Sequence, residues 1–140
     1  MSVDGTTEAE ALVRRFYEPL STGETDLVDE VLAPEWEALP ALHAGPGRDG
    51  WKATTAYLRS VLGDLDFTIE DVIVAGDRVA VRSVTRGTHQ GELLGIPATG
   101  RQVEIRASDY HQVEGGRIVR SWHLEDYYGV VQQLSAGNNA

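Results

Sequence analysis

Residues 103–125 read VEIRASDYHQVEGGRIVRSWHLE, and this stretch decides the fold. Two runs of alternating polar and apolar residues, 103–113 and 118–125, flank Gly115-Gly116, which is a two-residue hairpin signal. The stretch therefore predicts two antiparallel strands joined by a tight turn. It also contains the two residues with the strongest claim to acid/base chemistry, Asp109 and His123.

The register of this hairpin decides which side chains share a face of the sheet. With a plain two-residue turn, Asp109 faces Trp122, and His123 points to the opposite face. A β-bulge that adds one residue between Ile118 and His123 brings His123 onto the Asp109 face. We expect such a bulge. Unbroken pairing through Trp122 would remove His123 from the site.

Period-two patterns also precede the hairpin. Residues 67–74 and 79–89 predict two further strands, which are connected by a turn at Gly76-Asp77. A loop at 91–100 leads from the second of them into the hairpin, and a short strand is expected at about 36–39. Four strands in succession predict an antiparallel meander.

The first third of the chain predicts helices that cover this sheet. Thr6 or Thr7 can cap the first helix, whose apolar residues recur at helical spacing. The predicted helices cover about residues 8–20, 26–32, 49–62 and 130–134. Helices followed by a meander indicate an α+β fold in which the N-terminal helices pack in the concave face of a curved antiparallel sheet of four or more strands. We expect one domain over residues 1–140, with a cavity between the helices and the sheet.

Composition narrows the classes of function. The 140 residues carry 12 basic and 22 acidic side chains, a net charge of −10 that repels phosphate backbones, so we expect no nucleic-acid partner. The chain has no cysteine, which excludes disulfides, thiolate metal sites and cysteine nucleophiles. No apolar run approaches the roughly 20 residues that span a bilayer, and the first ten residues lack the features of a secretory signal. We therefore expect no membrane partner and a cytoplasmic location.

Metal and cofactor motifs are also missing from the sequence. The four histidines, His43, His89, His111 and His123, do not form pairs at the spacings of metal ligands. No phosphate-binding loop and no nucleophile elbow is found. We expect no metal and no cofactor, so any chemistry falls to proton transfer by carboxylates and histidines.

Asp109 and His123 are the candidate catalytic residues. Period two places Asp109 on the face of Ile105 and Ala107, and a carboxylate on a cavity wall has a raised pKa that suits a general acid or base. Histidine takes and returns protons near neutral pH. The alternatives are a solvated carboxylate at 109 and an exposed strand histidine at 123.

Five further residues are candidates for substrate binding. They are Trp36, His43, Tyr57, His89 and Trp122. Aromatic rings on a cavity wall suit an aromatic or polycyclic ligand, and the alternative is that they belong to the core. His89 can instead organise the loop that follows it, and His43 can be a simple loop residue.

Several stretches resemble the SnoaL-like polyketide cyclases, a family within the nuclear transport factor 2-like superfamily of α+β cones. The similarity runs from about Val13 to Leu134. It is carried by GTHQG at 87–91, LGIPATGR at 94–101, Asp109, GRIV at 116–119, Trp122, Asp126 and QQL at 132–134. The resemblance implies the cone-shaped fold and an intramolecular aldol reaction.

The resemblance also marks a departure at the site. The acid/base aspartate of these cyclases falls on His123 of this chain, and a histidine of theirs falls on Asp109. The acid and the imidazole are thus exchanged between two neighbouring strands.

We therefore expect a cofactor-independent cyclase of a polyketide-like carbonyl compound, with a small apolar or polycyclic molecule as its partner. Alternatives on the same fold are an isomerase, a dehydratase, an epoxide hydrolase or a non-catalytic binder of an apolar molecule. The superfamily commonly dimerises through the outer sheet face, so we expect a homodimer that uses Val79 and Val81 or the face of Arg82 and Val84.

Overall fold

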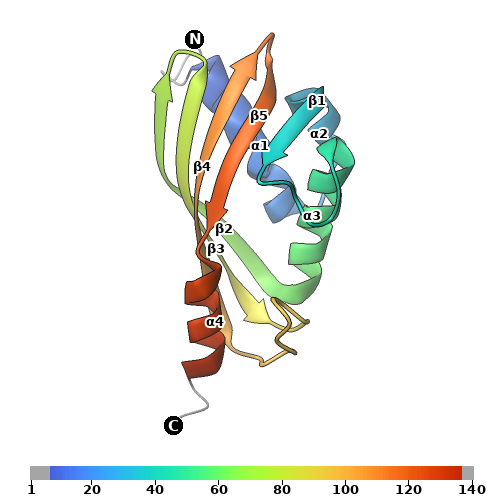
Figure 1. Cartoon of the computed structure of the whole chain (residues 1–140), viewed down its shortest axis with the longest axis vertical. Helices are drawn as coiled ribbons and strands as arrows, with labels where there is room; N and C mark the ends of the chain where they lie inside the picture. The colour runs from blue at the N-terminus through green and yellow to red at the C-terminus, as the bar shows by residue number, and fades with distance from the viewer. Residues whose placement is uncertain (1–6, 137–140) are drawn as a thin grey trace.

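Figure 1 shows the computed structural model, which describes residues 7–136. Its strands are β1 (Leu32–Leu39), β2 (Leu62–Ala75), β3 (Arg78–His89), β4 (Gln102–Glu114) and β5 (Arg117–Glu125). Its helices are α1 (Glu8–Thr22), α2 (Val28–Val31), α3 (Gly47–Val61) and α4 (Tyr127–Ala136). The strands form one five-stranded sheet in the order β1-β5-β4-β3-β2.

The predicted meander is confirmed, and the sheet is mixed rather than wholly antiparallel. Strands β2 to β5 pair antiparallel in succession, whereas β1 pairs parallel with β5. Residues 32–39 form a longer strand than the expected one at 36–39. The segment contains Pro34 and lacks a clean period, and its partner lies about 85 residues further along the chain, so local patterning could not show this pairing.

Helix α1 begins where its capping signal predicted. The Thr7 hydroxyl accepts a hydrogen bond from the Glu10 backbone N–H at 3.0 Å, and Glu8 and Glu10 lie in the first turn, where the helix dipole favours negative charge. Gly23 ends the helix with φ of 78°, a left-handed conformation that glycine adopts without steric cost. The predicted cap at Thr7 is thus confirmed.

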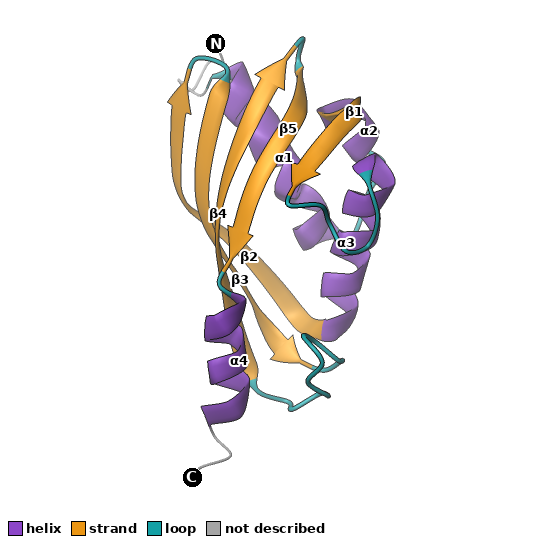
Figure 2. Ribbon diagram, viewed as in Figure 1, coloured by secondary structure: helices purple, strands orange, loops and turns teal. Residues whose placement is uncertain are grey.

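Three helices cover one face of the sheet, as the α+β prediction required. Figure 2 shows α1, α2 and α3 on one side of the strands, and α4 beyond the end of β5. Side chains of α1 and α2 form one core cluster with Val79, Val81 and Ile118. Val130 and Leu134 of α4 belong to a second core cluster, which includes Val103 and Ile105 at the start of β4.

The predicted bulge is present in the hairpin. Gly115 and Gly116 both have positive φ, as a tight two-residue turn requires, and Glu114 pairs with Arg117. Val113 then pairs with Ile118, whereas Gln112 pairs with Arg120, which leaves Val119 as the extra residue. Asp109 consequently pairs with His123. Opposite residues of an antiparallel pair have Cβ atoms about 5 Å apart and project from the same face.

Candidate active site

The inner face of the β4–β5 hairpin carries a line of polar side chains under the helices. Asp109 and His111 come from β4, and Ser121, His123 and Glu125 come from β5. Since side chains alternate along a strand, these residues share one face, and α1 adds the hydroxyl of Tyr17 to them. The site therefore joins two paired strands and one helix.

Asp109 is bound through one of its two carboxylate oxygens. The Tyr17 hydroxyl donates to Oδ2 at 2.6 Å, and Oδ1 is buried without a hydrogen-bond partner among residues 7–136. Burial raises the pKa of Asp109 to about 6, against the lowering effect of the Tyr17 hydrogen bond. The negative charge of Glu125 raises this pKa further, and the positive charge of His123 lowers it. A carboxyl group with a pKa near 6 can act as a base at neutral pH and can return the proton.

His123 is held by an acceptor at each ring nitrogen. Its Nδ1 lies 2.7 Å from Oε2 of Glu125, and its Nε2 lies 2.7 Å from the carbonyl oxygen of Pro40. A carbonyl only accepts, so Nε2 carries a proton, and a carboxylate favours a proton on Nδ1 as well. The hydrogen bond to Glu125 is the largest influence and raises the pKa of His123, while partial burial lowers it. This environment favours the imidazolium form.

His111 lies deeper and is kept neutral. Its Nε2 is 2.8 Å from the Tyr17 hydroxyl, and its Nδ1 is 2.7 Å from the Ser121 hydroxyl. Burial, and then the charge of His123, lowers the pKa of His111 to about 3. Trp36 donates its indole N–H to the same Ser121 oxygen at 3.0 Å. A continuous chain of hydrogen bonds thus connects Trp36 to Asp109.

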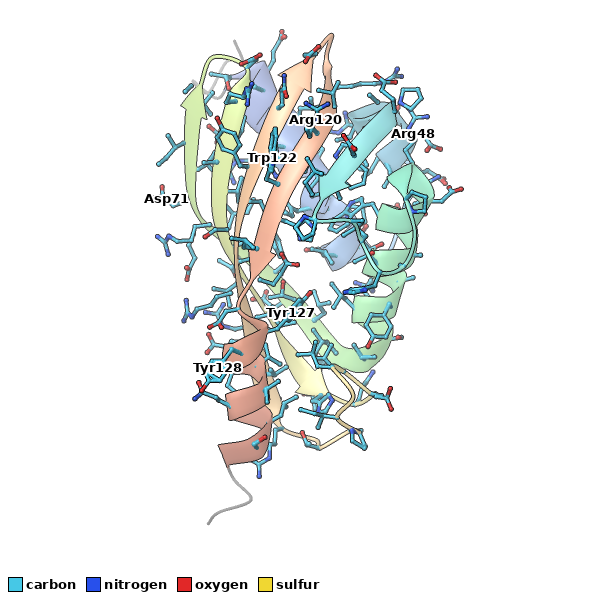
Figure 3. The ribbon with its side chains drawn as sticks, viewed as in Figure 1. Arg48, Asp71, Arg120, Trp122, Tyr127 and Tyr128 are labelled. Atoms are coloured by element: carbon cyan, nitrogen blue, oxygen red, sulfur yellow. The ribbon has the colours of Figure 1, made fainter. Side chains whose placement is uncertain are left out.

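The structure brings Asp109 and His123 together, and it places two of the candidate binding residues elsewhere. Trp122 lies on the outer face of the sheet, where its ring is 5.6 Å from that of Tyr110 and 5.9 Å from the Arg120 guanidinium (Figure 3). The bulge that turns His123 inward turns Trp122 outward. Trp36 is only 4% exposed, because β1 pairs with β5 and its helix-facing side is covered by Phe16. Trp36 thus lies in the core and Trp122 on the face opposite Asp109, and a substrate-binding role for either residue stays a prediction.

His89 organises the loop that follows β3, which was the alternative interpretation of this residue. The Thr99 backbone N–H donates to Nδ1 at 3.2 Å, and the Gly100 N–H donates to the His89 carbonyl at 2.8 Å. Because a backbone N–H only donates, Nδ1 is an acceptor, and the neutral ring carries its proton on Nε2. That atom is buried without a partner among the described residues.

Tyr57 and His43 lie nearer to the surface. The Tyr57 hydroxyl donates to the Glu92 carbonyl at 2.6 Å, and Tyr57 is among the groups that raise the pKa of Tyr127. Tyr127 itself stands at the start of α4, just below the end of β5 (Figure 3), and donates to Glu125 at 3.2 Å. His43 is an exposed residue of the loop that also presents the Pro40 carbonyl to His123.

Tyr17, Ser121 and Glu125 are site residues that sequence reasoning missed. The position of Glu125 could have been predicted, because it lies two residues after His123 on a predicted strand and so shares its face. Tyr17 was recognised as part of the buried face of the first helix, but its partner Asp109 lies 92 residues away. No local pattern indicates such a contact.

Neither of two hollows in the surface is lined by Asp109 or His123. One, of about 530 Å³, is lined by the start of β2 together with Ser21, Arg59, Thr88 and Gln90. Another, of about 340 Å³, is lined by outward residues such as Arg82 and Arg106 and also by Glu125, the partner of His123. The side chains of His123 and Glu125 are 18% and 19% exposed, so the pair is reached from the solvent without a deep cavity.

Within the described part of the chain, no group of three or more His, Asp or Glu side chains is placed to hold a metal ion. None of the helices among residues 7–136 is long and apolar enough to cross a membrane.

Comparison with known proteins identifies the family of the chain. Residues 11–134 match the family model of the SnoaL-like polyketide cyclases. The chain is 30% identical to the aklanonic acid methyl ester cyclase DnrD of Streptomyces peucetius over 128 residues, which cover 88% of each protein. The cyclase of the same name from Streptomyces sp. strain C5, DauD, is also 30% identical over 88% of this chain and 79% of its own length.

Solved structures show the same fold. TsrD from Streptomyces laurentii superimposes with a TM-score of 0.85 and is 28% identical, over 97% of this chain and 98% of its own. Wild-type IdmH from Streptomyces antibioticus gives a TM-score of 0.78 at 28% identity, over 92% of this chain and 99% of its own. With a five-stranded mixed sheet under helices and a family match over residues 11–134, the chain belongs to the SnoaL-like polyketide cyclase family.

Proposed function

We propose that this protein is a cofactor-independent cyclase that closes a ring in a polyketide-like carbonyl compound by aldol chemistry. The observation that carries the proposal is the Asp109–His123 pair, in which a carboxyl group with a pKa near 6 faces an imidazole whose pKa is raised by Glu125. Two groups with separately adjusted proton affinities are the usual mark of an acid/base site.

In the proposed reaction, Asp109 removes a proton from a carbon next to a carbonyl group. The resulting enolate carbon attacks a second carbonyl carbon of the same molecule, which forms a C–C bond and leaves an alkoxide. The alkoxide takes a proton back from Asp109, so the reaction is balanced without an oxidant or a reductant. Acid/base assistance of this kind contributes roughly 10² to 10⁴ in rate.

His123 has a different part in the proposal from the one expected from the sequence. Both of its ring nitrogens already face protein acceptors, Glu125 and the Pro40 carbonyl. We therefore assign it the role of a fixed positive charge that stabilises the enolate and the alkoxide, while Asp109 moves the proton in both directions. Glu125 holds that charge in place.

The remaining features of the proposal follow from the chemistry of the site. Proton transfer and charge stabilisation need no cofactor. We place the substrate, a small apolar or polycyclic molecule, at the partly exposed edge of Asp109 and His123. Tyr57, Tyr127 and His43 lie near this edge. We keep residues 1–140 as one SnoaL-like domain with a cytoplasmic location.

We also keep the homodimer as a proposal, with a change of surface. Val79, Val81 and Val84 are 0%, 3% and 0% exposed, so they cannot serve as an interface. Exposed residues of the outer face, among them Arg82, Tyr110 and Leu124, are available instead.

The substrate named for the relatives provides the test. Aklanonic acid methyl ester is incubated with the wild-type protein, and the ring-closed isomer is followed by chromatography and mass spectrometry. We expect Asp109→Asn to lose at least about 100-fold in kcat/KM.

A matched control is Glu104→Gln, since Glu104 is an acidic residue on the outer face of the same strand. We expect it to keep the wild-type rate. If Asp109→Asn turns over the ester at the wild-type rate, the assignment of Asp109 as the base is refuted. Binding of the ester, measured by quenching of tryptophan fluorescence, without turnover by the wild type would indicate a binder instead.

A further inference from the structure

The buried chain of hydrogen bonds between Trp36 and Asp109 has one direction of donation, and Trp36 at its far end sets that direction. An indole N–H only donates, so the Trp36–Ser121 bond uses the Ser121 oxygen as an acceptor. The hydroxyl hydrogen of Ser121 is then available for Nδ1 of His111, which lies 2.7 Å away. With Nδ1 as an acceptor, the neutral ring carries its proton on Nε2.

The donors and acceptors between His111 and the Asp109 carboxylate can be assigned in the same way. The Nε2–H of His111 donates to the oxygen of Tyr17, and the Tyr17 hydroxyl donates to Oδ2 of Asp109. Trp36 starts the chain as a donor, and each of Ser121, His111 and Tyr17 accepts one hydrogen bond from behind and gives one toward Asp109. All polar atoms of the four residues behind Asp109 are thereby satisfied, which buried groups require.

The reversed chain is less favourable for a specific reason. If Asp109 carried its proton on Oδ2, it would donate to Tyr17, Tyr17 would donate to His111, and Nδ1–H would donate to Ser121. The Ser121 oxygen would then accept from both His111 and Trp36. Its own hydrogen would have no acceptor among the hydrogen bonds of residues 7–136, at a buried position where an unsatisfied donor is costly.

We propose that Trp36, Ser121 and His111 are positioning residues that form a one-directional chain of donors, which occupies Oδ2 of Asp109 and reserves Oδ1 for proton transfer with the substrate. Oδ1 is the carboxylate oxygen that is buried without a hydrogen-bond partner among the described residues. The inference deepens the proposed function and rests on it for the role of Oδ1. The direction of the chain is a separate property that can be measured without a substrate.

The groups around Asp109 are few enough for this measurement to be interpreted. Tyr17 faces it from α1, His123 and Glu125 from β5, and Tyr127 approaches from α4. On its own strand lies His111, which burial keeps neutral with a pKa of about 3. Between about pH 5 and 8 the His111 ring therefore reports only which nitrogen holds its single proton.

The test is ¹⁵N NMR of the His111 ring in the wild-type protein and in Trp36→Phe. In the wild type we expect the proton on Nε2 above and below the pKa of Asp109, because the proton that Asp109 gains goes to Oδ1. In Trp36→Phe the Ser121 oxygen loses its fixed donor, so the chain can reverse. The ratio of Nε2–H to Nδ1–H at about pH 5 should then fall roughly tenfold relative to the wild type.

Trp51→Phe is the matched control, because Trp51 is also buried and donates its indole N–H at 3.0 Å, but to the backbone carbonyl of Phe16. It should leave the His111 tautomer unchanged. Ser121→Ala, compared with Ser121→Thr, provides a second pair if Trp36→Phe does not fold. The alanine should weaken the preference for Nε2–H, and the threonine hydroxyl should restore it.

A wild-type His111 protonated on Nδ1, or equal tautomer ratios in Trp36→Phe and Trp51→Phe, would overturn the inference. Failure of the proposed function looks different, because Asp109→Asn would then keep its turnover whatever the tautomer of His111. With both correct, Trp36→Phe also moves the acid limb of the kcat/KM profile to higher pH, whereas Trp51→Phe leaves it in place.

Discussion

The two faces of the β4–β5 hairpin differ in their side chains and in their environment. On the inner face, Asp109 and His123 lie under the helices, and their environment raises the pKa of both groups. On the outer face, the rings of Tyr110 and Trp122 contact each other at a tilt of 55° beside Arg120, next to solvent. The faces are separated by the thickness of one sheet, and the single extra residue Val119 decides which residues of β5 lie on which face.

Burial under the helices, which raises the pKa of Asp109, is one feature that distinguishes the candidate site from the outer face. A carboxyl group under the helices loses its hydration, and its charged form becomes less favourable. The aromatic and arginine contacts of the outer face stabilise the sheet by about 0.5–1 kcal/mol each while remaining hydrated. Chemistry is therefore expected on one face, and solubility or association on the other.

Insertion of one alanine between Arg120 and Ser121 should produce the largest effect, because it exchanges the faces from Ser121 onward. The hairpin would bury Trp122 and expose His123, so we expect complete loss of turnover and a fall of at least about 4 kcal/mol in the free energy of unfolding. Turnover and urea denaturation check both effects. Deletion of Val119 is the control, because Arg120 then follows Ile118 and still pairs with Gln112, which keeps Asp109 opposite His123. An active insertion variant would show that the register does not control the site.

The pH dependence of stability should show the next largest effect. Asp109 has a pKa of about 6 in the folded chain against an ordinary value of 3.8, so it binds its proton more tightly when folded. Its contribution is complete below pH 3.8 and is lost as the pH rises through about 6. The raised pKa of His123 acts in the same direction, with a contribution present below about 6.5 and lost as the pH rises through its folded value.

Asp109→Asn removes the titration of this carboxyl group and so isolates it. The free energy of unfolding of the wild type should fall relative to that of Asp109→Asn by roughly 3 kcal/mol at most between about pH 4 and pH 8. Urea denaturation at several pH values measures this difference. Parallel curves for the two proteins would contradict the raised pKa.

Trp122→Ala should produce the smallest effect. It removes the ring that contacts Tyr110 and Arg120 on the outer face, so we expect a loss of about 1 kcal/mol in stability and a change of less than about twofold in kcat/KM. Thermal unfolding and turnover give the two values. A loss of activity comparable to that of Asp109→Asn would place the outer face in the site.

Much of the fold could be predicted because its signals are local. Alternation in 103–113 and 118–125, the turn at Gly115-Gly116 and the cap at Thr7 all act within a few residues, and the structure confirms each. The parallel strand β1 could not be predicted, because its pairing with β5 joins segments about 85 residues apart.

The candidate site also has some features that could be predicted from the sequence and others that only the structure shows. The sequence by itself predicted proton transfer as the chemistry, offered Asp109 and His123 as the candidates, and determined that one bulge would decide whether they met. Only the tertiary structure decided that Trp122 lies outside, that Trp36 is buried, and that Tyr17, His111 and Ser121 connect Trp36 to Asp109. The physical reason is that residue type and period are local properties, whereas burial and the direction of a hydrogen bond depend on which distant segments pack against one another.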